Sequence, residues 1–272
     1  MSPLWRDEIG IFVTPGSVHL NRMCRGVRPH CIADVGVNVR PKSVAGWTSA
    51  LEALGDKLAE PAWHHANARV VVSDLWVRYA IVPWADALSG REERLVHARH
   101  LLTQSFGETG EDWELALSDA GPGRSQVVCA MPRALTVALG ELLAPARLRL
   151  LSLQPQLVVA FNCWRHVLPR SDAWLVSLAT GSLAAAHLGV DGWDQVRSIR
   201  IGTDWATELR RLRTFGRLAA GVSSQSRVFV DAPFWLHRLG PEADDSLEIL
   251  DQQLIAPRGT LEKLVALKGM HA

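Results

Sequence analysis

Two similar stretches of sequence decide the fold: EIGIFVTPGSVHL at Glu8–Leu20 and WLVSLATGSLAAAHL at Trp174–Leu188. Each one reads as an apolar strand, a turn that contains Gly-Ser, and a second apolar strand. Gly16-Ser17 aligns with Gly181-Ser182 at an offset of 165 residues (181 − 16), so each copy begins one half of the chain. This repeat predicts a protein built from two related halves.

The remainder of each half follows the same order of elements. In the first half we expect strands at Ile9–Val13, Val18–Met23 and Ile32–Val39, a helix near Val44–Leu58 capped by Ser43, and a strand at Arg69–Ser73. In the second half the matching elements are strands at Leu175–Leu178, Leu183–Leu188 and Val196–Ile201, a helix at Trp205–Phe215, and a strand at Arg227–Val230. RVVVSDLW and RVFVDAPFW also match, at an offset of 158 (227 − 69). We interpret this as a duplicated βββαβ unit; the alternative is chance similarity among apolar strands.

A separate α+β segment lies between the two halves. Its expected elements are strands at Trp76–Val82, Trp113–Leu117, Gln126–Met131 and Arg147–Leu151, a helix from Ser89 to Phe106, and a helix at Pro132–Leu143. A helix at Gln154–His166 leads into the second half, and a strand at Leu247–Leu250 and a helix near Thr260–Lys268 follow it. The predicted domains are therefore 1–75 with 146–170, the insertion 76–145, and 171–272.

Composition limits the classes of function. The chain has 272 residues and a net charge of +1, which gives no electrostatic basis for binding nucleic acid or an anionic membrane. The N-terminus lacks the pattern of a signal peptide, and no apolar run is long enough to span a bilayer. The spacing of the four cysteines fits neither a zinc site nor a redox pair. We expect a cytoplasmic protein without a bound metal.

The segment from Ser73 to Glu108, SDLWVRYAIVPW…LSGREERLVHARHLLTQSFGE, carries a family resemblance. With the duplicated unit around it, the chain resembles the actin-like ATPases, and among them PilM, MshI and the cytoplasmic domain of the type II secretion L protein. The resemblance implies an α/β, actin-like (ribonuclease H-like) fold of two lobes, with duplicated βββαβ units and a small α+β insertion. It also implies a place in the assembly of type IV pili or type II secretion systems.

The resemblance also locates a nucleotide cleft. Such ATPases carry an Asp at the end of the first strand of each half, which holds Mg²⁺, and this chain has Phe12 and Ser177 there. His19 stands where the family commonly has Lys or Gln. The vestigial cleft would consist of Thr14, Gly16, Ser17, Thr180, Gly181, Ser182 and Gly202. Without both carboxylates we expect no hydrolysis, no catalytic residue, no metal ligand and no cofactor.

Two alternatives stay open at this stage. One is a PilM-like protein that still binds ATP, with metal ligands supplied by Asp204 or Asp231. The other is a small-molecule enzyme such as a sugar kinase, which would need a catalytic Asp that the sequence does not clearly provide.

The resemblance implies protein partners. We expect a membrane-anchored assembly protein, PilN-like or similar to the secretion M or L proteins, and possibly a secretion ATPase or a second copy of the chain. Arg210, Arg211 and Arg213 are candidate partner-binding residues, with an ordinary solvated helix face as the alternative. The secretion L proteins continue into a membrane helix, whereas this sequence ends at Ala272. We therefore expect a stand-alone protein, a fragment or a diverged relative that a partner recruits to the inner membrane.

Overall fold

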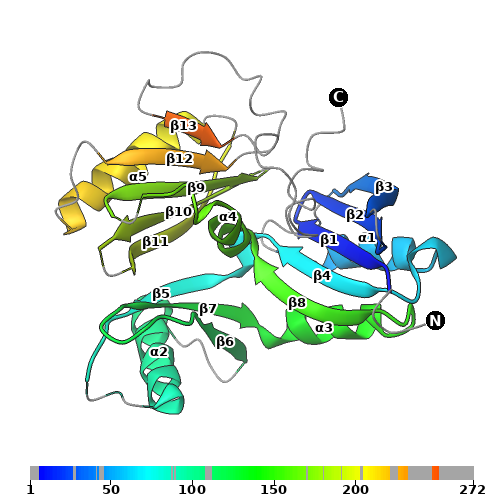
Figure 1. Ribbon diagram of the computed structural model, residues 1–272, viewed down its shortest axis with the longest axis horizontal. Coiled ribbons are helices and arrows are strands. Elements are labelled where there is room, and N and C mark those ends of the chain that lie inside the picture. The colour runs from blue at the N-terminus through cyan, green and yellow to red at the C-terminus, as the bar shows by residue number, and fades with distance from the viewer. Residues whose placement is uncertain are drawn as a thin grey trace. The chain divides into compact units, whose positions relative to one another are not determined.

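The computed structural model (Figure 1) describes residues 6–26, 29–40, 42, 46–86, 88, 90–107, 112–169, 171–179, 181–190, 192–202, 205–220, 226–231 and 247–250. These residues form two compact units. The first contains the described residues of 1–76 and 134–163, and the second contains those of 77–133 and 164–250. No described helix is long and apolar enough to cross a membrane.

The first unit is built on a five-stranded sheet in the order β3-β2-β1-β4-β8. Its strands are β1 (Glu8–Thr14), β2 (Ser17–Cys24), β3 (His30–Asn38), β4 (Asn67–Val72) and β8 (Arg149–Pro155). The first three are antiparallel neighbours, whereas β4 is parallel to both β1 and β8. The helices are α1 (Thr48–Leu58), α3 (Arg133–Leu143) and α4 (Gln156–Trp164), with short 3-10 turns at Pro61–Trp63 and Asp74–Trp76.

The second unit repeats this sheet in the order β11-β10-β9-β12-β13. The strands are β9 (Ala173–Ala179), β10 (Ser182–Gly189), β11 (Gly192–Arg200), β12 (Arg227–Asp231) and β13 (Leu247–Leu250), and α5 spans Trp205–Ala220. The strand directions are the same as in the first sheet. The expected duplication is therefore confirmed by strand order and direction, which chance similarity of apolar runs does not produce.

The insertion forms a three-stranded sheet in the second unit. Its elements are β5 (Arg78–Val82), β7 (Gln126–Pro132) and β6 (Trp113–Leu117), in that order across the sheet, with α2 (Arg91–Phe106) packed on it. β5 contacts β11, and the Ser125 hydroxyl donates to the Trp193 carbonyl at 3.0 Å. The insertion thus has its own core but rests on the edge of the second sheet (Figure 1). The predicted domain boundaries stay a prediction.

Several element ends differ from the sequence expectation for local reasons. The helix expected from Val44 begins at Thr48, and the proposed cap Ser43 lies outside the described residues. Helix α2 begins after Gly90, whose N–H donates to the Glu93 side chain at 3.0 Å; the expected cap Ser89 also lies outside the described residues. The expected helix at Thr260–Lys268 lies outside them as well.

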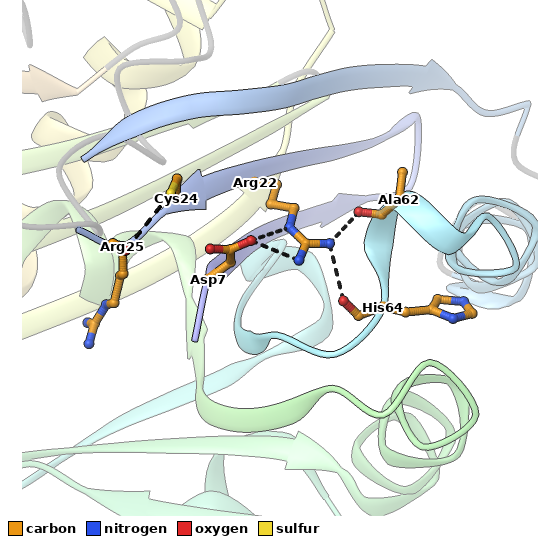
Figure 2. A network of polar contacts seen from close by, with 6 residues as sticks. All are labelled: Asp7, Arg22, Cys24, Arg25, Ala62 and His64. Atoms are coloured by element: carbon orange, nitrogen blue, oxygen red, sulfur yellow. Dashed lines mark hydrogen bonds and ion pairs between the residues drawn. The ribbon is translucent and has the colours of Figure 1, made fainter. Parts of the chain in front are cut away.

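A polar network ties the start of the first sheet to the loop before β4 (Figure 2). Arg22 on β2 contacts one Asp7 carboxylate oxygen through Nε at 2.9 Å and Nη2 at 2.8 Å. Its remaining nitrogen donates to the carbonyls of Ala62 and His64, at 2.5 and 3.1 Å. Because one planar guanidinium satisfies all three groups, the network fixes the loop against the sheet.

Candidate functional site

The first Gly-Ser hairpin joins β1 to β2, and its two hydroxyl groups bond to each other. Thr14 Oγ1 accepts a hydrogen bond from the Ser17 N–H at 3.0 Å and lies 2.9 Å from Ser17 Oγ. The Gly16 carbonyl accepts from the Val39 N–H at 2.8 Å, which joins the turn to the end of β3. Thr14 is buried, so its hydroxyl forms hydrogen bonds within the turn.

The turn of the second hairpin is hydrogen-bonded through its backbone in the same way. The Gly181 carbonyl accepts from the Ile201 N–H at 3.1 Å, as the Gly16 carbonyl does in the first half. Gly181 has a left-handed φ of +77°, which favours glycine there. Ser182 is buried, and Gly202 is exposed and directly follows the buried Ile201. Thr180 lies outside the described residues.

Phe12 and Ser177 occupy equivalent positions, two residues before the last residue of β1 and β9. Phe12 packs with Val71, Val159 and Cys163 in an apolar cluster beneath α4. Ser177 is 2% exposed, and its Oγ has no hydrogen-bond partner among the described residues. One position is thus apolar and the other is polar, buried and uncharged.

Asp231 ends β12 beside Ser177, because the two residues are register partners in the parallel pair of β12 and β9. Its side chain is 1% exposed and accepts a hydrogen bond from Trp164 Nε1 at 3.2 Å. Trp164 is the last residue of α4 and belongs to the second unit, so this bond lies within that unit. A buried carboxylate therefore stands next to Ser177, although Ser177 itself carries no charge.

Comparison with known proteins identifies the fold. No protein-family model matches the sequence, and no curated protein is similar to it in sequence. The structure is similar to PilM in a PilM-PilN type IV pilus biogenesis complex, with a TM-score of 0.65, 17% identity and 96% of each chain covered. A Bacteroides thetaiotaomicron protein with an actin-like ATPase fold and unknown function gives a TM-score of 0.59 at 10% identity, with 98% of each chain covered. The chain has the actin-like ATPase fold.

A third similar structure is the cytoplasmic domain of EpsL, an inner membrane component of the type II secretion system of Vibrio cholerae. It gives a TM-score of 0.57 at 12% identity, covering 96% of this chain and 94% of that one. At these identities the similarity shows the fold alone. The fold and the structural likeness to PilM and the secretion L protein, both expected from the sequence, are confirmed.

Within the actin-like fold, the predicted cleft residues fall into two sets. Thr14, Gly16 and Ser17 form the first hairpin, and Gly181, Ser182 and Gly202 lie at the second. An actin-like ATPase uses such hairpins to hold phosphate, for which it needs free N–H groups. In the first hairpin the Ser17 N–H is already bonded to Thr14. The role of both sets as a vestigial nucleotide cleft stays a prediction.

The predicted basic residues lie on α5. Arg211 pairs with Glu208 at 2.6 Å, and Arg210 donates to the Thr207 hydroxyl at 3.1 Å. Both arginines are exposed, whereas the side chain of Arg213 lies outside the described residues. Contacts within one helix are what a solvated face produces, so they do not distinguish the two interpretations of this surface.

Three buried polar groups were missed by sequence reasoning. Glu8 is 0% exposed and pairs with Arg25 at 2.8 Å and Arg69 at 2.5 Å. The carboxylate of Asp74 accepts the N–H of Leu157 in the first turn of α4, with both oxygens within 3.2 Å. In both cases the partners are far apart in the sequence, so no local motif indicates them.

The third missed group is a buried histidine between two carboxylates in the second unit. His187 on β10 lies 3.2 Å from Asp194 and 3.5 Å from Asp172, and its ring packs on Trp174. The Ser226 hydroxyl donates to Asp172 Oδ1, the same oxygen that lies 3.5 Å from His187 Nε2, so the serine and the histidine meet at one carboxylate oxygen. Among the described residues, no group of three or more His, Cys, Asp or Glu side chains is arranged so that it could hold a metal ion.

Proposed function

We propose that this protein is a non-catalytic scaffold of a type IV pilus or type II secretion-like apparatus. It acts in the cytoplasm and is recruited to the inner membrane by a membrane-anchored partner similar to PilN. Its fold is shared with PilM and with the cytoplasmic domain of EpsL, and this supports the proposed class of function. No nucleotide turnover is part of the proposal.

The observation that carries the proposal is the packing of Phe12. An actin-like ATPase uses a carboxylate at this position to hold Mg²⁺ and its waters, and hard cations require oxygen ligands. Phe12 instead contributes its ring to the apolar cluster with Val71 and Val159. Burial of an aromatic ring is favourable, so the substitution stabilises the sheet and removes the metal ligand together.

A second function is favoured by Asp231. This residue places a buried carboxylate beside Ser177, and a carboxylate there is the group that a PilM-like ATP-binding protein needs. Against this alternative, Trp164 already donates a hydrogen bond to the carboxylate. That bond occupies Oδ1, and Asp231 is 1% exposed, so a hydrated Mg²⁺ would have to displace neighbouring side chains to reach the carboxylate. We therefore rank ATP binding second.

The partners follow from the same proposal. A membrane-anchored PilN-like protein is the first, and a secretion ATPase and a second copy of the chain are the others. Arg210, Arg211 and Arg213 would attract an acidic partner segment, because they place positive charge on one stretch of α5.

Calorimetric titration of ATP into the full chain, with and without Mg²⁺, tests the proposal. We expect no binding heat in either case and no change in thermal stability. Micromolar binding that requires Mg²⁺ would overturn the scaffold function. The variant Asp231→Asn then identifies the alternative, because it removes the charge and keeps the shape of the Trp164 acceptor. Loss of Mg²⁺-dependent binding in this variant would establish Asp231 as the ligand.

A further inference from the structure

β8 is the outer strand of the first sheet, and the described part of the chain pairs with only its inner side, through β4. Arg149, Leu150 and Leu151 at the start of the strand are all exposed. The two leucines are 40% and 39% exposed, although leucine is among the residues most often buried. An exposed strand edge offers unpaired backbone groups to another chain, so this combination marks a surface for strand addition.

The backbone direction can be assigned from one hydrogen bond. The N–H of Arg149 donates to the Ala66 carbonyl at 3.0 Å, so it points inward. Because backbone groups of successive residues in a strand point to opposite sides, the N–H and C=O of Leu150 point outward. The register then shifts, since Ala68 pairs with Leu150 and Arg69 with Ser152. This bulge leaves Leu151 as the extra residue at the edge.

The edge is positively charged, and no acidic side chain of the described residues pairs with that charge. Arg147 and Arg149 are exposed, and neither forms an ion pair with a described residue. The sequence from 142 to 171 contains no Asp or Glu. A second copy of this strand would therefore bring two more arginines and no carboxylate. Charge complementarity selects an acidic occupant.

We propose that the β8 edge, defined as Arg147 to Ser152, binds an extended segment of a partner protein in which acidic and apolar side chains alternate. The outward backbone of Leu150 would pair with that segment, the two leucines would contact its apolar side chains, and the arginines would contact its carboxylates. The proposal rests on the scaffold function, because it assigns a docking surface and a chemistry to the partner.

Selection of displayed random peptides on the full wild-type chain tests this directly. The peptides should match β8 in length, which is 7 residues. Each enriched sequence is then synthesised with a fluorescein label, and its Kd is measured by anisotropy. Leu150→Pro removes the outward N–H, and Arg147→Glu with Arg149→Glu reverses the charge without altering the backbone.

Matched controls exist on the same fold. Ile32 lies on β3 at the opposite edge of the same sheet, is 49% exposed, and is the residue that the register shift of β3 leaves without a register partner, so Ile32→Pro controls for proline at an edge. Arg99 is exposed on α2, so Arg99→Glu controls for charge reversal. Circular dichroism confirms that each variant is folded.

We expect the enriched peptides to alternate apolar and acidic residues, and both edge variants to weaken their binding by about tenfold or more. The controls should leave Kd within about twofold of the wild type. Absence of enrichment, enrichment of peptides without acidic residues, or equal binding by the edge variants would each overturn the proposal. If the wild-type chain forms a dimer and Leu150→Pro abolishes it, the occupant of the edge is a second copy of the chain, and the proposed partner segment is wrong. Mg²⁺-dependent ATP binding, by contrast, would overturn the proposed scaffold function, and it would not change the result of the peptide-binding test of this edge.

Discussion

Replacement of Glu8 by glutamine perturbs a fully buried charge in the first sheet. The carboxylate receives Arg25 Nη2 at 2.8 Å on one oxygen and Arg69 Nε at 2.5 Å on the other. The amide of glutamine keeps one acceptor and turns its NH₂ group toward the other arginine, which is also a donor. The variant therefore loses one charge-assisted bond and weakens the second.

The expected cost follows from the exposure of the two arginines. Their side chains are 42% and 25% exposed, so both can recover part of their hydration after the substitution. A hydrogen bond to a charged group contributes about 1.5–3 kcal/mol net, and a buried pair that loses one partner costs about 3–5 kcal/mol. We expect Glu8→Gln to lower the free energy of unfolding by about 2–3 kcal/mol, near the lower limit of the second range.

Urea denaturation followed by circular dichroism measures this cost. Glu52→Gln is the matched control, because Glu52 belongs to the same unit and pairs with Lys42 at 2.7 Å while its side chain is 53% exposed. A surface pair of this kind contributes about 0–1 kcal/mol. Equal costs for the two variants, both below about 1 kcal/mol, would refute the assignment of a stabilising role to the buried carboxylate.

Three further substitutions, one of them with a matched control, test other contacts. Thr14→Val removes the hydroxyl that closes the first hairpin, and chemical denaturation should show a loss of about 1–2 kcal/mol. Asp74→Ala removes the carboxylate at the first turn of α4, and hydrogen exchange of that turn should accelerate with a loss of about 1–2 kcal/mol. Gly189→Ala places a Cβ against the Asp194 carboxylate, which must then move away from His187, and should cost about 1–3 kcal/mol, whereas Gly140→Ala meets no atom within 4 Å and should stabilise α3 by about 0.5–1 kcal/mol. Thermal unfolding compares this pair, and equal effects would contradict the contact at Asp194.

The repeated hairpins could be predicted because their signals are local. Apolar strands around Thr-Pro-Gly-Ser and Thr-Gly-Ser turns need no information from elsewhere in the chain. The pairing of distant groups could not be predicted in this way. Glu8 and Arg69 meet only because β1 and β4 are parallel neighbours, and Asp74 meets the Leu157 N–H across 83 residues of the chain. These contacts depend on sheet order, which the sequence pattern does not contain.

One alignment from the sequence also required correction. The letters of RVVVS and RVFVD match at an offset of 158 (227 − 69), whereas the sheet register pairs Phe12 with Val71 and Ser177 with Asp231. If Phe12 and Ser177 are equivalent, the strands correspond at an offset of 160 (231 − 71). The two-residue difference keeps every side chain on its face, because strands have a period of two. The matching sequence letters therefore gave a different strand correspondence from the one in the two sheets. Only the observed register of β12 and β9 places Asp231 beside Ser177.

What the two halves share and where they differ follow from different physical requirements. The hydrogen bonds from Val39 to the Gly16 carbonyl and from Ile201 to the Gly181 carbonyl recur because a three-stranded meander must satisfy the backbone of its turn. The side chains of Phe12 and Ser177 take no part in these backbone hydrogen bonds. Each position can therefore hold any side chain that fits its own surroundings. Phe12 fits an apolar cluster, and Ser177 is small and lies beside a buried carboxylate. The fold can therefore persist while the chemistry of its two strand ends changes independently, and a functional assignment has to rest on these side chains and on exposed surfaces such as the β8 edge.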